Sequence, residues 1–242
     1  MVLIRYSPPY DWPMISGWLR TRAIEGVEVV SEHDYRRDGV IVRHDAAENA
    51  LQVPQRFASR ARRLFDVDAD PRLIRATLAK DKLLAPRLRK RPGVRVPGAW
   101  DPFELAIRAI VGQQISVAGA RTILGRIAAA HGFVPERLAE VSIGGMPTRR
   151  SETIRRLSRA VASGDLVLQR DSIAGLTSIP GIGPWTAHYI AMRLGDPDAF
   201  PAGDLILRRA AGNLTERELL RRAESWRPWR AYGAMLLWTT PG

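Results

Sequence analysis

Residues 176–204 combine a turn that can grip phosphate with an acidic side chain that could act on the molecule so held. The turn is the Pro-Gly-Ile-Gly stretch at residues 180–183, and Pro184 after it can open a helix. Glycines let a ligand approach the backbone closely, and free N–H groups at a helix N-terminus bind phosphate without reading a base. Asp204 follows that helix. The combination is typical of a protein that holds DNA and carries out chemistry on it.

Asp204 also has a purely structural interpretation. An aspartate directly before an apolar run, here LILRRAAG, is a good N-cap and stabilises a helix by about 1 kcal/mol. The residues alone favour this cap over a catalytic role. The two roles are compatible, because a capping carboxylate is held rigidly and its second oxygen can face a cleft.

Four aromatic residues could surround such a cleft: Trp185, Tyr189, Trp229 and Trp238. Trp185 and Tyr189 are four residues apart on one predicted helix, so they share a face. Core packing explains such a pair more often than ligand binding does. A flipped base would change that balance, because bases extruded from a duplex are held by stacking between aromatic side chains.

Several chemistries are excluded by residue types that are missing. The sequence has no cysteine, which excludes disulfides, thiolate zinc sites and cysteine-ligated iron–sulfur clusters. No lysine follows Lys90, so the region around the turn cannot supply the amine for a Schiff base with an abasic sugar. The histidines have no metal-ligand spacing, and no nucleophile motif is present. We therefore expect no required cofactor.

The net charge of +12 and the pI near 11.1 favour a polyanionic partner, most simply nucleic acid. The arginine excess over only three lysines can also reflect genome composition. No stretch approaches the ~20 apolar residues that span a bilayer. The start of the chain lacks the layout of a signal peptide. We expect a monomeric cytoplasmic protein, associated with the nucleoid and not with a membrane.

The elements that must position these residues fall into two kinds, which together predict an α+β, mainly α, fold. Short β-branched runs at 27–30, 39–44 and 49–53, flanked by predicted helices at 12–24 and 55–65, indicate a small antiparallel sheet. From Asp70 onward the pattern is helical. The predicted helices are 72–84, 102–111, one capped by Ser116 and ended by Gly132, 148–163, 173–179, 184–194, 205–211, 217–223 and 229–239, with a basic connector at 86–100.

This pattern suggests three parts. Residues 1–70 form a small α+β N-terminal domain, residues 71–99 plus 197–242 form a helical subdomain that carries Asp204, and residues 100–196 form a helical subdomain that carries the hairpin. Glu104, near the start of a predicted helix, is interpreted as a charge that satisfies the helix dipole.

Extended motifs along nearly the whole chain resemble the helix–hairpin–helix DNA glycosylase superfamily, and within it the DNA-3-methyladenine glycosylase II family. The matching stretches are SPPYDW at 7–12, RAIEGVE at 22–28, RLFDVDADP at 63–71, RPGVRVPGAWDPFELAIRAIVGQQISV at 91–117, PGIGPWTAHYIAMR at 180–193, the FPAGD stretch ending at Asp204, and ERELLRRAESWRPWRAYGAMLLW at 216–238. The resemblance implies a helix–hairpin–helix glycosylase fold with a small N-terminal sheet domain.

The resemblance also implies roles for particular residues. It makes Asp204 the catalytic carboxylate and places Trp185, Tyr189 and Trp238 around the base pocket. It implies that Gln114 fills the gap left in the duplex by the flipped nucleotide. The remaining DNA-binding candidates are Gln113 beside it and Gly181, Gly183 and Thr186 of the hairpin. Backbone carbonyls of Thr177, Ile179 and Gly181 are candidates to hold a monovalent cation.

The implied activity is a monofunctional glycosylase acting on alkylated purines in duplex DNA during base excision repair, because the lysine of bifunctional relatives is replaced by Trp185. Gly203 and Leu205 depart from the family pattern, which has an acidic and an aromatic residue beside the catalytic acid. Gln114 is polar where the family has an aliphatic side chain. Two alternatives stay open: a non-catalytic DNA-binding protein, in which Asp204 is only a cap, and a glycosylase of the same fold for oxidised or deaminated purines.

Overall fold

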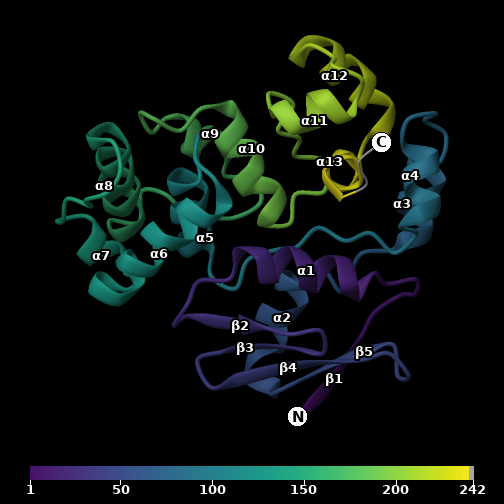
Figure 1. Cartoon of the computed structure of the whole chain (residues 1–242), viewed down its shortest axis with the longest axis horizontal. Helices are drawn as coiled ribbons and strands as arrows, with labels where there is room; N and C mark the ends of the chain where they lie inside the picture. The colour runs from purple at the N-terminus through teal and green to yellow at the C-terminus, as the bar shows by residue number, and fades with distance from the viewer. Residues whose placement is uncertain (240–242) are drawn as a thin grey trace.

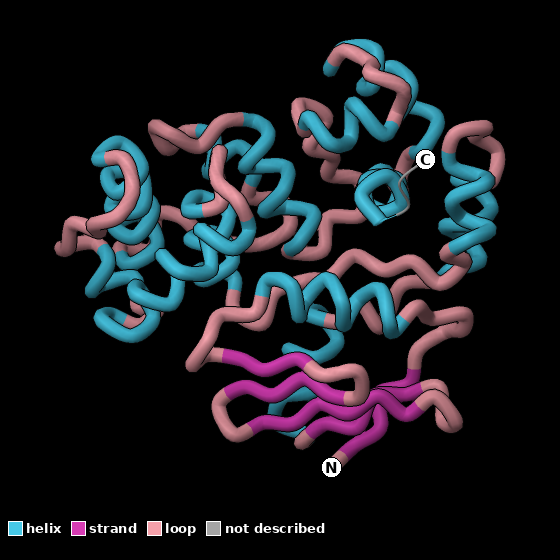
Figure 2. The backbone as a smooth tube through the Cα atoms, in the orientation of Figure 1, coloured by secondary structure: helices cyan, strands magenta, loops and turns pink. Residues whose placement is uncertain are grey.

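The computed structural model describes residues 1–239, as a small sheet at one end and helices elsewhere (Figure 2). The sheet has the order β1-β5-β4-β3-β2, and every neighbouring pair is antiparallel. The three predicted strands are confirmed, while β1 and β3 were missed because one is terminal and the other is the polar run DYRR. The strands are β1 (Val2–Arg5), β2 (Glu28–Val30), β3 (Asp34–Arg37), β4 (Val40–Asp45) and β5 (Ala50–Val53).

Helix α1 (Trp12–Arg22) lies between the sheet and the helical part of the molecule (Figure 1). Asp11 caps it by accepting the Met14 N–H at 3.0 Å, and the helix contacts both β2 and α6 (Val117–His131). A short 3-10 turn η1 (Gln55–Phe57) and α2 (Ala58–Leu64) follow the sheet. Because α1 faces the helices, its side chains can reach a site formed by the rest of the chain.

Most of the predicted helices are confirmed, including α5 (Pro102–Val111) and the Ser116 cap and Gly132 end of α6. The single helix predicted over 72–84 is wrong. It ends at Leu78, and a new helix begins at Leu84, because the Asp81 side chain accepts the N–H groups of Leu83 and Leu84. The other helices are α3 (Pro71–Leu78), α4 (Leu84–Lys90), α7 (Pro135–Leu138), α8 (Thr148–Ala162), α9 (Ile173–Thr177), α10 (Pro184–Arg193), α11 (Leu205–Ala210), α12 (Glu216–Ala223), η2 (Glu224–Trp226) and α13 (Arg230–Thr239).

Two apolar clusters make up the core. One joins the sheet and α1 to the C-terminal helices, through residues such as Leu51, Phe65 and Trp226. The other lies within α5, α6, α8 and α10. Tyr189 packs against both clusters, so the region around it is the place where the two halves of the molecule meet. Among residues 1–239, no helix is long and apolar enough to cross a membrane.

Candidate active site

The hairpin between α9 and α10 is held in one conformation by the neighbouring α8. Gly181 has a φ of +98°, a region that favours glycine, and a Cβ there would lie 2.0 Å from the Thr153 hydroxyl oxygen. Thr153 donates its hydroxyl to the Pro180 carbonyl at 3.1 Å. Gly183 is the exposed N-cap of α10 and provides no side-chain cap. The first N–H groups of α10 are therefore open to an anionic ligand.

The loop between α5 and α6 is tied to this hairpin through Gln113. Its side-chain amide donates to the Thr186 hydroxyl at 2.9 Å and to the Gly181 carbonyl at 3.3 Å. The Thr186 side chain is buried, so a DNA contact by this residue would come from its backbone. Gln114 is exposed and has a φ of +56°, a left-handed conformation in the loop between α5 and α6.

The three carbonyls that are candidates for a cation lie in the hairpin. The Ile179 carbonyl accepts the Ile182 N–H at 3.0 Å, and the Gly181 carbonyl accepts Gln113. The Thr177 hydroxyl donates back to carbonyls of α9. A carbonyl has two lone pairs, so the accepted bond leaves the Ile179 and Gly181 carbonyls each able to bind a cation. In residues 1–239, no group of three His, Asp or Glu side chains could hold a metal ion.

Asp204 is the N-cap of α11, as the sequence predicted, and it also contacts two tryptophans. Its Oδ1 accepts the Leu207 N–H at 2.9 Å and the Trp238 indole N–H at 3.1 Å. Its Oδ2 accepts the Trp185 indole N–H at 3.1 Å. A carboxylate can accept about four hydrogen bonds. Three donors therefore fix the orientation of Asp204 and leave acceptor capacity for a sugar or a water.

Aromatic rings form the wall beside Asp204. The rings of Trp185 and Tyr189 are stacked, with centroids 5.6 Å apart, and Trp238 meets Tyr189 edge-on at 6.2 Å. Trp18 of α1 adds a ring that the sequence did not single out, 5.7 Å from Trp238. Trp229 instead packs edge-on against Tyr232. The three predicted pocket residues thus lie together, with Trp18 as a fourth.

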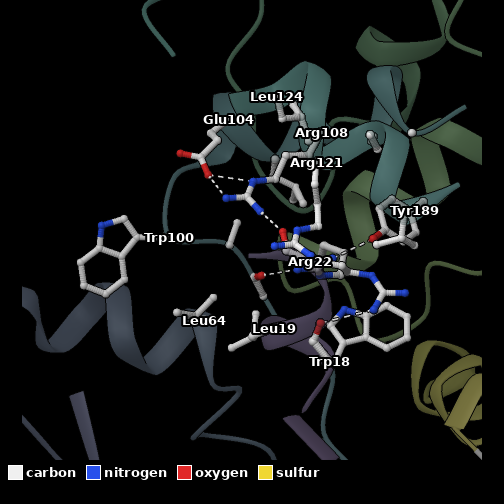
Figure 3. A pocket seen from close by; sticks show the side chains of 18 of the residues that line it. Trp18, Leu19, Arg22, Leu64, Trp100, Glu104, Arg108, Arg121, Leu124 and Tyr189 are labelled. Atoms are coloured by element: carbon white, nitrogen blue, oxygen red, sulfur yellow. Dashed lines mark hydrogen bonds and ion pairs between the residues drawn. The ribbon is translucent and has the colours of Figure 1, made fainter. Parts of the chain in front are cut away.

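These rings surround a cavity of about 320 Å³, which also contains Asp204 and the Ile206 side chain in its wall. The cavity continues past Trp18 and Arg22 to charged residues between the sheet and α5 (Figure 3). Its volume falls in the range of small-molecule pockets and is large enough for a single purine.

A balanced cluster of buried charges lines the inner end of the cavity. Arg37 donates to Glu104 at 3.0 Å, and Arg108 donates to Glu104 at 2.8 Å and to Glu28 at 2.7 Å. Burial acts to raise the pKa of Glu104, but the guanidinium groups of Arg37 and Arg108 hold it below its usual value. Glu104 therefore joins the sheet to α5. The prediction that it only compensates the helix dipole missed these two ion pairs.

Tyr189 lies in a region of positive charge. Its hydroxyl accepts a hydrogen bond from Arg193 at 2.8 Å. The positive charge of Arg22 also lies close enough to lower the pKa of this hydroxyl. Burial acts to raise the pKa of Tyr189, but the charges of Arg193 and Arg22 lower it below the ordinary value of tyrosine.

Gly203 and Leu205, the two residues beside Asp204 that depart from the family pattern, have different surroundings. A Cβ at Gly203 would lie 3.4 Å from the nearest carboxylate oxygen of Glu216, the first residue of α12. Glu216 thus brings a carboxylate to the position where the resemblance expects an acid. Leu205 is 53% exposed and contributes no aromatic ring to the wall.

The chain is similar in sequence to known proteins over its whole length. The family model described as the AlkA N-terminal domain matches residues 1–101. DNA-3-methyladenine glycosylase 2 of Escherichia coli (strain K12) is 32% identical over 282 residues, which cover 100% of this chain and 98% of that protein. A Mycobacterium tuberculosis (strain ATCC 25618 / H37Rv) protein, "Probable bifunctional transcriptional activator/DNA repair enzyme AlkA", is 38% identical over 96% of this chain. The chain spans only 55% of that relative.

The fold is also found among solved structures. The 3-methyladenine DNA-glycosylase from Archaeoglobus fulgidus superposes with a TM-score of 0.81 over 98% of this chain and 97% of that chain, at 19% sequence identity. The mainly helical architecture with a small N-terminal antiparallel sheet is therefore that of the helix–hairpin–helix glycosylases. Together with the full-length similarity to the Escherichia coli protein, this places the chain in the DNA-3-methyladenine glycosylase 2 (AlkA) family.

Proposed function

We propose that this protein is a monofunctional DNA glycosylase, which flips alkylated purines of the 3-methyladenine and 7-methylguanine type out of duplex DNA. It then hydrolyses the N-glycosidic bond and leaves an abasic site for base excision repair. One observation carries the proposal: Asp204 is held by the indoles of Trp185 and Trp238 at an aromatic cavity of about 320 Å³. Membership of the family supports the same reaction.

The chemistry follows from where charge develops. An alkylated purine carries a positive charge and leaves with the electron pair of the glycosidic bond, so the enzyme need not protonate it. Positive charge then develops on the deoxyribose. The Asp204 carboxylate stabilises that charge or orients a water that adds to the anomeric carbon and loses a proton. The faces of Trp and Tyr favour a cationic base by ~0.5 to 2 kcal/mol.

The absence of lysine from the chain after Lys90 supports a reaction that stops at the abasic site. Trp185 donates its indole N–H to Asp204, and the resemblance implies that bifunctional relatives carry their lysine at this position. An indole N–H cannot form a Schiff base with the sugar, so no strand cleavage follows base release.

DNA binding is assigned to the open N-terminus of α10, with Gly181 and Gly183, and to Gln113 and Gln114 of the adjacent loop. The net charge of +12 supports duplex DNA as the partner, and the proposal takes the protein to be a cytoplasmic monomer. A monovalent cation held by hairpin carbonyls would add positive charge near the phosphates.

A base-release assay tests the proposal directly. Duplex DNA containing 3-methyladenine or 7-methylguanine is incubated with excess enzyme, and the free base is measured by chromatography. We expect release of both bases with the strand intact until alkali is added. Covalent trapping of the protein on DNA by borohydride, or no base release at all, would contradict the proposal.

Gln114→Ala is expected to weaken binding to abasic-site DNA about tenfold and to change binding to undamaged duplex little. The exposed Gln114 lies beside the hairpin contact of Gln113 and fills the gap in the base stack only when a nucleotide has left it. Fluorescence anisotropy with matched duplexes measures both affinities. Equal losses on the two duplexes would mean that Gln114 is only a phosphate contact.

A further inference from the structure

Three arginines that form no salt bridge within residues 1–239 line the cavity: Arg22, Arg193 and Arg121, which is exposed and donates its Nε to the Ala23 carbonyl at 2.7 Å. Arg22 belongs to α1 and Arg193 to α10. The neighbouring Arg37 and Arg108 are instead paired with glutamates. The wall of the cavity thus carries unpaired guanidinium charge beside the paired Arg37 and Arg108.

Arg193 is committed to the protein. Its guanidinium donates to the Tyr189 hydroxyl at 2.8 Å, to the Gly98 carbonyl at 2.8 Å and to the Pro97 carbonyl. It is also buried, at 7% exposure. Arg193 thus fixes Tyr189 and the adjacent chain, and it has little capacity left for a ligand.

Arg22 is placed differently. Its guanidinium carbon lies 3.5 Å from the centroid of the Trp18 ring, and both side chains line the cavity (Figure 3). One of its nitrogens, Nη1, donates to the Trp18 carbonyl at 3.3 Å and to the Thr21 hydroxyl at 2.9 Å. A guanidinium has five N–H donors, so Arg22 retains donors on Nε and Nη2 beyond its interaction with Tyr189.

This position gives Arg22 two opposite effects on a base in the cavity. A purine that carries a formal positive charge would be repelled by the Arg22 cation, which opposes the attraction of the aromatic faces. A neutral purine with a carbonyl oxygen would accept a charge-assisted hydrogen bond from the free guanidinium nitrogens. The lowered pKa of Tyr189 is consistent with this positive environment.

We infer that Arg22 sets the charge preference of the base pocket, by binding the carbonyl oxygen of neutral purines and disfavouring cationic ones. The substrate class that Arg22 serves is a neutral oxopurine, such as deaminated adenine. The inference rests on the proposed function, because the same cavity and reaction are assumed.

Arg22→Met tests this assignment, since methionine keeps much of the side-chain length and removes the charge and the donors. Single-turnover release is measured for hypoxanthine, a neutral oxopurine, and for 3-methyladenine, a cation without a carbonyl. We expect hypoxanthine release to fall at least about tenfold and 3-methyladenine release to stay equal or rise, because a lost polar contact discriminates between substrates that need it and those that do not. Arg20→Met, an exposed position on the same helix, is the matched control and should leave the ratio unchanged.

The test of Arg22 rests on the ratio of the hypoxanthine and 3-methyladenine release rates, compared between variant and wild type. Equal changes in both substrates, or an unchanged ratio, would overturn the inference. If Arg22→Met does not fold, Arg22→Gln must still shift the ratio toward 3-methyladenine by at least about threefold, because it also removes the charge. A wild-type enzyme that releases 3-methyladenine but no hypoxanthine overturns the role of Arg22 and leaves the proposed function intact. A wild type that releases neither base overturns the proposed function itself.

Discussion

Replacing Asp204 by asparagine is expected to slow base release by about 10³-fold or more while the protein stays folded. The substitution removes the negative charge that would face the developing positive sugar. It also turns one acceptor into a donor, so the contacts with the indole N–H groups of Trp185 and Trp238 cannot both persist. Single-turnover release of 3-methyladenine from duplex DNA measures the loss.

The same variant separates catalysis from helix capping. Asparagine is as good an N-cap as aspartate, so the bond to the Leu207 N–H that starts α11 can be kept. The thermal midpoint of Asp204→Asn should therefore stay close to that of wild type, and binding to abasic-site DNA should be retained. Asp204→Ala loses the cap as well, at about 1 kcal/mol. Wild-type activity in Asp204→Asn would reduce Asp204 to a structural cap.

The sequence predicted those features of the fold and of the site that depend on residues close together in the chain. The glycine turn and Pro184 predict the hairpin, and the apolar run after Asp204 predicts its cap. The four-residue spacing of Trp185 and Tyr189 puts both rings on one face of α10, where they stack. Each of these features depends on contacts within a helix turn, which spacing alone determines.

The missing parts depend on contacts between distant segments. Trp18 and Arg22 lie on α1, more than 160 residues from Tyr189, and a tryptophan and an arginine four residues apart on a helix are typical of ordinary packing. No periodicity reports that α1 lies between the sheet and the helices. Only tertiary packing brings this helix to the cavity, and with it Arg22, whose charge adds to that of Arg193 in lowering the pKa of Tyr189.

Glu104 shows the same limit for a single residue. Its place in the first turn of α5 fits a helix-dipole charge, and Asp101 does cap that helix by accepting the Glu104 N–H at 2.8 Å. The Glu104 side chain, however, points to Arg37, 67 residues earlier in the sheet domain. Helix-end patterns correctly place Glu104 in the first turn of α5. They contain no information about the ion pair between its carboxylate and Arg37.

Glu104→Gln is expected to lower the free energy of unfolding by about 3 to 5 kcal/mol, because it removes the buried carboxylate that pairs with both Arg37 and Arg108. Glu104 is 3% exposed and binds Arg37 and Arg108 together. The remaining partners are Glu28, which pairs with Arg108, and the exposed Asp38, whose solvated charge compensates the buried Arg37 only in part. For a chain of this size the thermal midpoint should fall by about 10 °C. Urea unfolding followed by circular dichroism measures the change.

A double variant distinguishes a lost charge balance from a packing defect. Replacing Arg37 and Glu104 together, as Arg37→Met with Glu104→Leu, removes one cation and one anion and leaves Arg108 paired with Glu28 at 2.7 Å. Since a buried ion pair can often be replaced by apolar residues at little cost, the double variant should be more stable than Glu104→Gln alone. If the two variants were equally unstable, shape and not charge would hold the sheet against α5. If Glu104→Gln cost under about 1 kcal/mol, the cluster would have to be solvated in solution, as for an exposed pair.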